Sequence, residues 1–132
     1  MTTMTTRLAR RPLLPLALRL DAVVTGANGA AYLVAAGPLG DLLGLSPALL
    51  RGAGAALLAF AAVVWLAPPR PGGAVTAIVA ANAAYAAGCL VAAILGAGSP
   101  TAAGTVWIVL QALVVAGFAE LQLTGARRML RR

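Results

Sequence analysis

Hydrophobic residues fill four long segments of this chain, separated by short polar or Gly- and Pro-rich stretches. The apolar segments cover residues 15–36, 47–67, 74–95 and 100–123. A membrane-spanning helix needs about 20 mostly apolar residues, so each segment is long enough to cross a bilayer. The connecting stretches at 37–46, 68–73 and 96–99 are short, so consecutive helices should be antiparallel neighbours. The pattern predicts an all-α membrane protein, a bundle of four antiparallel transmembrane helices.

Composition supports a membrane protein and excludes a water-soluble globular one. Of the 132 residues, 61% are hydrophobic and only 10% are charged, whereas a soluble domain is about half apolar and a quarter charged. The net charge of +7 would by itself suggest nucleic-acid binding, but the arginines flank apolar runs instead of alternating with polar or aromatic residues. We therefore expect the lipid bilayer as a partner and no nucleic acid.

The distribution of arginines predicts the orientation of the helices. Nine of the ten fall on one side of the predicted membrane: Arg7, Arg10, Arg11, Arg19, Arg70, Arg127, Arg128, Arg131 and Arg132. Only Arg51 falls on the other side. Arginine concentrates in cytoplasmic loops, so both termini should be cytoplasmic. The chain then divides into a basic cytoplasmic leader (1–14), the transmembrane bundle (15–123) and a basic cytoplasmic tail (124–132).

The N-terminus also resembles a secretory signal peptide, because arginines precede an apolar stretch. Arg19 and Asp21 interrupt that stretch, which favours a first membrane span over a cleaved signal. A cleaved signal peptide is the alternative.

The two halves of the chain contain similar motifs. Residues 27–32 (ANGAAY) correspond to 81–85 (ANAAY), and Ser46-Pro47 corresponds to Ser99-Pro100. Each Ser-Pro pair can begin a helix, with serine as the N-cap and proline as the first helical residue. We interpret the similarity as two helical hairpins of a parallel repeat, with Asn28 and Asn82 at similar depth.

The residue types needed for most enzyme chemistry are scarce. The chain has no histidine, one cysteine and three carboxylates far apart in sequence. No metal-ligand cluster or catalytic triad can be assembled from these residues. We therefore predict a protein that is not an enzyme, with no catalytic residue, metal or cofactor.

The candidate functional residues are polar side chains inside the predicted spans: Asp21, Thr25, Asn28, Tyr32, Asn82, Tyr85 and Gln111. The four on the first helix are spaced 4, 3 and 4 residues apart, which places them on one face. A polar side chain facing lipid costs several kcal/mol, so we expect them to point into the bundle or an oligomer interface. One reading is hydrogen bonds between helices; the other is a polar path with Asp21 at its cytoplasmic end.

The charged residues near the C-terminus are candidates for ion pairs at the cytoplasmic interface: Glu120, Arg127, Arg128 and Arg131. Glu120 shares a helix face with Arg127 and Arg131. Asp21 has no arginine one turn away on its own helix, so Arg127 or Arg128 of the fourth helix is its candidate partner.

Three segments of the chain resemble segments of small four-helix integral membrane proteins of unknown function in high-GC bacteria. These segments are residues 18–21 (LRLD), 28–32 and 109–117. The chain is similar to DoxX-like proteins in topology only, with four helices and both termini inside. It departs from small multidrug transporters, whose carboxylate lies deeper in the first helix, and from dual-topology fluoride channels, whose pores are lined by phenylalanine. The resemblance implies a four-helix fold and a location in the bacterial cell membrane. It implies no particular activity.

Two functions are compatible with these patterns. The first is a multi-pass membrane protein that acts through helix packing, as a homo-oligomer or as an accessory subunit of another membrane protein. The alternative is a small transporter or channel with a polar path along the first, third and fourth helices.

Overall fold

The computed structural model describes residues 12–131, which form five α-helices and no β-strand. The helices are α2 (Leu13–Val34), α3 (Ala36–Leu43), α4 (Pro47–Leu66), α5 (Gly73–Leu95) and α6 (Ala102–Leu130). The predicted all-α class is confirmed, with one helix more than expected in the described part of the chain. Most of the predicted basic leader lies outside the described residues, and so do Arg7, Arg10, Arg11 and Arg132 of the predicted arginine distribution.

Three of the helices, α4, α5 and α6, are long and apolar enough to cross a membrane. Helices α2 and α3 meet the same criterion only as a pair, and the pair is bent by 97°. The structure therefore contains three candidate membrane spans, or four if the bent pair is one span.

The bend between α2 and α3 has a local cause at Pro38. Continuing α2 through this position would need a hydrogen bond from residue 38 to the carbonyl of Val34, and proline has no N–H to donate. The helix instead breaks at Ala35 and restarts at Ala36, where a proline in the first turn loses no hydrogen bond. The stretch 37–46, predicted as a loop, is therefore mostly helix α3, which ends at Gly44 in the left-handed conformation.

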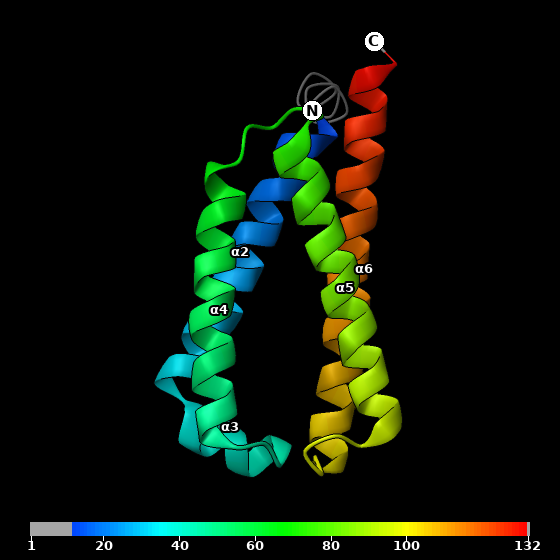
Figure 1. Ribbon diagram of the computed structural model, residues 1–132. Coiled ribbons are helices and arrows are strands. Elements are labelled where there is room, and N and C mark those ends of the chain that lie inside the picture. The colour runs from blue at the N-terminus through cyan, green and yellow to red at the C-terminus, as the bar shows by residue number, and fades with distance from the viewer. Residues whose placement is uncertain (1–11, 132) are drawn as a thin grey trace, which may run out of the picture.

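The long helices form two antiparallel hairpins. Helix α4 packs along α2, and α6 packs along α5, while α2 also contacts α6. Helices α4 and α5 come together only at one end, in the hydrophobic cluster described below, and they diverge toward the other end (Figure 1). The antiparallel hairpins agree with the predicted topology, but the bundle is not closed on all sides.

A close contact between two glycines fixes α2 against α4. A Cβ atom built on Gly29 would lie 2.8 Å from the carbonyl oxygen of Gly54, and one built on Gly54 would lie 2.7 Å from that of Gly29. Such distances leave no room for a methyl group, so the two backbones touch here. Small residues at this crossing allow the first hairpin to pack closely.

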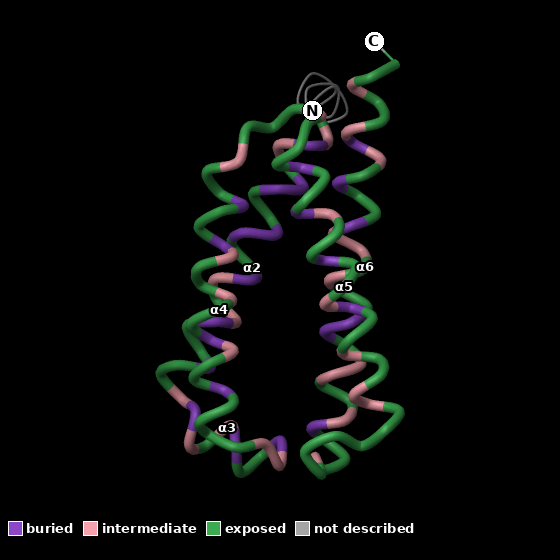
Figure 2. Tube along the Cα trace, in the orientation of Figure 1, coloured by how far each residue is buried: buried purple, intermediate pink, exposed green. Residues whose placement is uncertain are grey.

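At the end that holds the start of α2 and the end of α6, the two hairpins join in a hydrophobic cluster (Figure 1). Its buried members come from three helices: Leu14, Leu18, Ala22, Val64, Val75 and Ile78. In Figure 2 the buried residues lie mainly on the inner sides of the helices, and the outer sides are exposed. Exposed apolar side chains on the outer sides are what helices in lipid present.

At the opposite end, Thr101 connects α3 to the start of α6. Its hydroxyl donates a hydrogen bond to the carbonyl of Leu42 at 2.7 Å, and its backbone N–H donates to that of Leu43 at 3.0 Å. These carbonyls end α3 and have no partner within their own helix. Thr101 thus terminates α3 while it caps α6, accepting a hydrogen bond from the backbone N–H of Gly104 at 3.1 Å.

The two Ser-Pro pairs do not play equivalent roles. Ser46 is the N-cap of α4, as predicted, and accepts from the backbone N–H of Leu49. The prediction for Ser99 is wrong, since Thr101 is the N-cap of α6 and Ser99 has a φ of +52° in the preceding turn. Helix α6 also continues to Leu130, well past the predicted end of the fourth segment at residue 123.

We predict that Gly54→Ala destabilises the protein, because the new methyl group would meet the backbone of Gly29. Overpacking of this kind costs about 1–3 kcal/mol in the free energy of unfolding. Gly52→Ala is the matched control, since a Cβ atom there has no neighbour within 4 Å among the described residues. Thermal unfolding of both variants in detergent measures the difference, and equal midpoints would contradict the close contact.

Candidate functional site

A buried carboxylate, Asp21 of α2, is the centre of one polar cluster. Asp21 is 0% exposed and accepts three hydrogen bonds, all from uncharged side chains. The donors are the Thr25 hydroxyl at 2.8 Å, the Asn82 amide at 2.8 Å and the Gln122 amide at 2.6 Å. The Asn82 amide also donates to the Gln122 carbonyl oxygen at 3.0 Å. We call these four residues the Asp21 cluster; it joins α2, α5 and α6.

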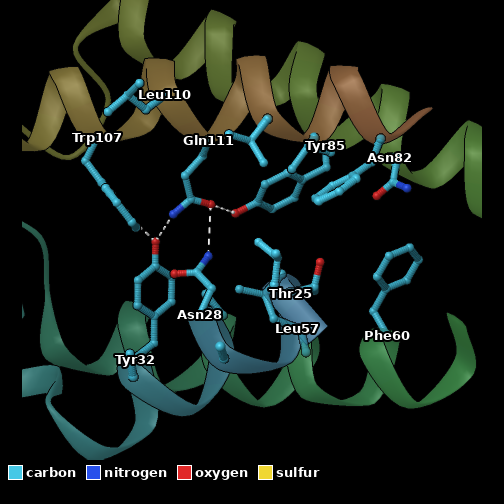
Figure 3. A pocket seen from close by; sticks show the side chains of 18 of the residues that line it. Thr25, Asn28, Tyr32, Leu57, Phe60, Asn82, Tyr85, Trp107, Leu110 and Gln111 are labelled. Atoms are coloured by element: carbon cyan, nitrogen blue, oxygen red, sulfur yellow. Dashed lines mark hydrogen bonds between the residues drawn. The ribbon is translucent and has the colours of Figure 1, made fainter. Parts of the chain in front are cut away.

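A second polar cluster lies further along α2 and is centred on Gln111 of α6 (Figure 3). The Gln111 carbonyl oxygen accepts hydrogen bonds from the Asn28 amide at 3.2 Å and from the Tyr85 hydroxyl at 2.9 Å. The Gln111 amide donates to the Tyr32 hydroxyl, which also accepts from the Trp107 indole N–H at 2.7 Å. We call these five residues the Gln111 cluster.

Each buried polar atom in the two clusters has at least one hydrogen-bond partner within the protein. Every buried side-chain nitrogen and oxygen of the described residues has a hydrogen-bond partner. The partners of α2 in both clusters come from α5 and α6, so these bonds hold the first hairpin to the second.

A cavity of about 960 Å³ lies between the hairpins. All five helices contribute to its wall, which is mainly apolar, with Leu57 and Phe60 on α4 and Leu110 and Phe118 on α6. The whole Gln111 cluster lines the cavity, and so do Thr25 and Asn82 of the Asp21 cluster. Asp21 and Gln122 do not line it.

The structure brings together all seven candidate residues predicted inside the spans. Asp21, Thr25, Asn28 and Tyr32 share the face of α2 that meets α5 and α6, as their spacing predicts. They form two groups, however, and no hydrogen bond between these groups is found in residues 12–131. The arrangement is that of bonds between helices, without a continuous chain of polar groups.

The predicted pairing of Asp21 with Arg127 or Arg128 is wrong. Gln122 precedes these arginines by more than one turn of α6 and already occupies the position facing Asp21. Both arginines are exposed. Uncharged amides replace the expected guanidinium as partners of the carboxylate.

The predicted ion pairs of Glu120 are absent from the described part of the chain, where no arginine nitrogen lies within 4.0 Å of a carboxylate oxygen. Arg127 is seven residues from Glu120 and Arg128 eight, which places each about 10–12 Å along the helix axis. Arg131 is farther still. A shared helix face does not bring these side chains into contact over two or more turns, and Glu120 is exposed.

The repeat does not place its two asparagines at the same depth. Asn28 bonds to Gln111 and Asn82 bonds to Gln122. These glutamines are eleven residues apart on α6, a separation of about 16 Å along the axis. The prediction of similar depth is therefore wrong: the short sequence motif recurs, but its asparagines have different partners.

Two contacts were missed from the sequence. Trp107 donates its indole N–H to the Tyr32 hydroxyl, and its position four residues before Gln111 places both on one face of α6. Arg19 stacks on Trp65 of α4, with its guanidinium carbon 4.1 Å from the ring centre. This cation–π contact adds a second link between α2 and α4.

Comparisons with protein-family models, curated proteins and solved structures found no match to this chain.

We predict that Gln122→Leu destabilises the protein, because it removes a donor to buried Asp21 and an acceptor for Asn82. Asp21 keeps Thr25 and Asn82 as donors, so the cost is that of the two lost hydrogen bonds, about 0.5–1.5 kcal/mol each in the free energy of unfolding. Glu120→Gln, on the exposed side of the same helix, is the control and should change little. Unfolding in detergent measures both; a Gln122→Leu variant as stable as the wild type would show that the Asp21 cluster contributes no stability.

Proposed function

We propose that this chain is a non-enzymatic, multi-pass membrane protein that acts through helix packing, as a homo-oligomer or as an accessory subunit of another membrane protein. The observation that carries the proposal is the pairing of the buried polar side chains with one another. Polar side chains that already hydrogen-bond to one another across α2, α5 and α6 hold these helices together. Helices this apolar, joined by such short connections, offer their outer surfaces for contact with lipid or another membrane protein.

The proposed orientation places both termini on the cytoplasmic side of a bacterial cell membrane. The start of α2 and the end of α6 lie at the same end of the molecule (Figure 1). Arg19, Arg127 and Arg128 belong to this end, and so does Arg70 in the connection between α4 and α5. Arg51, in the first turns of α4, is at the other end. This asymmetry supports the orientation that arginine-rich cytoplasmic segments favour.

A small transporter or channel is the second candidate, and buried Asp21 favours it. A carboxylate inside apolar helices is costly and commonly marks an ion or proton path. Against it, Asp21 already accepts hydrogen bonds from three side chains and does not line the cavity.

Flux and association measurements test the two candidates separately. We expect liposomes containing the wild-type protein to pass no protons, cations or small solutes above the level of empty liposomes. We expect crosslinking and native mass spectrometry from membranes to detect a second copy or another membrane protein. A strict monomer without a copurifying protein would contradict the packing proposal.

If flux is observed, Asp21→Asn and Asn28→Leu decide whether it follows the polar residues. If ions or solutes pass along the polar residues, both substitutions should change the flux without unfolding the protein. Glu120→Gln again serves as the control. Flux that is equal in all three variants would remove the polar path.

A further inference from the structure

The cavity between the hairpins combines a large apolar wall with one small polar area. Its volume of about 960 Å³ is at the upper end of the range of about 300–1,000 Å³ that small-molecule sites occupy. The polar area consists of the Gln111 cluster together with Thr25 and Asn82, at the side formed by α2, α5 and α6. Such a division suits a molecule with a long apolar body and a small polar group.

The Gln111 cluster retains capacity to donate hydrogen bonds. The Tyr32 hydroxyl accepts from both Trp107 and Gln111, and its own hydrogen is not used in these bonds. The Asn28 amide has two hydrogens and donates one of them, to Gln111. Both side chains lie in the space between α2 and α6 that the cavity occupies (Figure 3). A ligand oxygen that accepts hydrogen bonds would complement these two donors.

The cavity wall also selects by charge. Every described residue that lines it is uncharged, and the buried carboxyl group of Asp21 lies outside the lining with its own three donors. A phosphate or carboxylate group in the cavity would lose its hydration without gaining a cation. The polar group of a ligand should therefore be neutral.

The ends of the cavity are closed and one of its sides is not. At one end, the cluster of Leu14, Val64 and Ile78 brings α2, α4 and α5 together. At the other end, Thr101 holds α3 against α6, and Leu43 of α3 lines the cavity. Between the ends, α4 and α5 do not pack against each other. A molecule dissolved in the bilayer can reach the cavity through this side.

The closed ends also disfavour a protein segment as the occupant. A helix is about 10–12 Å in diameter and needs about 30 Å to cross the bilayer core. To lie in the cavity along its whole length it would have to displace either the hydrophobic cluster or α3. A small lipid fits between these two closures.

We propose that the cavity binds a single neutral lipid, a molecule with an apolar chain and a carbonyl, ester or hydroxyl oxygen that accepts hydrogen bonds from Tyr32 and Asn28. The lipid enters from the bilayer between α4 and α5. This inference goes beyond the proposed function and does not depend on whether the chain associates with another protein.

Photolabelling tests the proposal directly. The probe is a monoacylglycerol with a diazirine within its acyl chain and a terminal alkyne, added to the full-length protein in phosphatidylcholine vesicles. We expect saturable labelling that unlabelled monoacylglycerol competes away. Mass spectrometry should place the label on cavity residues such as Leu57, Phe60 and Leu110.

Two tryptophan variants of α4 provide a matched pair. Ala56 lines the cavity, whereas Ala55 is exposed on the same helix and does not line it. We expect Ala56→Trp to fill part of the cavity and weaken labelling about tenfold, and Ala55→Trp to label as the wild type does. A probe with the same chain and a phosphate headgroup should label the wild type about tenfold less than the neutral probe.

Three results would overturn the proposal: equal labelling of both tryptophan variants at equal folding, equal labelling by the phosphate probe, or label confined to the outer faces of the helices. Crosslinks from residue 56 to a second protein chain would assign the opening to a protein partner instead. If Ala56→Trp does not fold, the position of the label on the wild-type protein decides the question by itself.

Discussion

The hydrogen bonds donated to Asp21 are the interaction on which the arrangement of the helices depends. Apolar side chains in a bilayer gain little by leaving lipid for one another, so packing and hydrogen bonds must hold such helices together. Asp21 is completely buried, and its donors come from α2, α5 and α6. Leaving the carboxylate without these donors would be costly, so the first hairpin is constrained to lie against the second at this level.

The open cavity is a consequence of the same constraint combined with close packing inside each hairpin. The contact of Gly29 with Gly54 keeps α4 against α2, and α5 stays along α6. The hairpins then meet through the contacts of α2 with α5 and α6 in the middle, through the hydrophobic cluster at one end and through Thr101 at the other. Nothing in residues 12–131 draws α4 and α5 together between these ends, and the space between the hairpins stays open.

The fold could be predicted further than the site. Periodicity located four apolar segments and placed Asp21, Thr25, Asn28 and Tyr32 on one face, because these features depend on residues within one helix. The partners of these residues could not be predicted in the same way. Asp21 has three carboxamide- or hydroxyl-bearing partners where an arginine was expected, and Asn82 lies level with Asp21 and not with Asn28. The register between two helices depends on how their backbones pack. The spacing of residues along one helix carries no information about that packing.

The sequence by itself determined the helical class, the candidate spans and the set of polar residues that must avoid lipid. Helix length and the cost of exposing polar groups to an apolar solvent are local properties, and they can be read from one segment at a time. Only the tertiary structure decided that Gln122 faces Asp21, that Thr101 connects α3 to α6 and that a cavity lies between the hairpins. Each of these depends on segments distant in sequence meeting at a particular depth, and that meeting is set by backbone contacts such as Gly29 against Gly54.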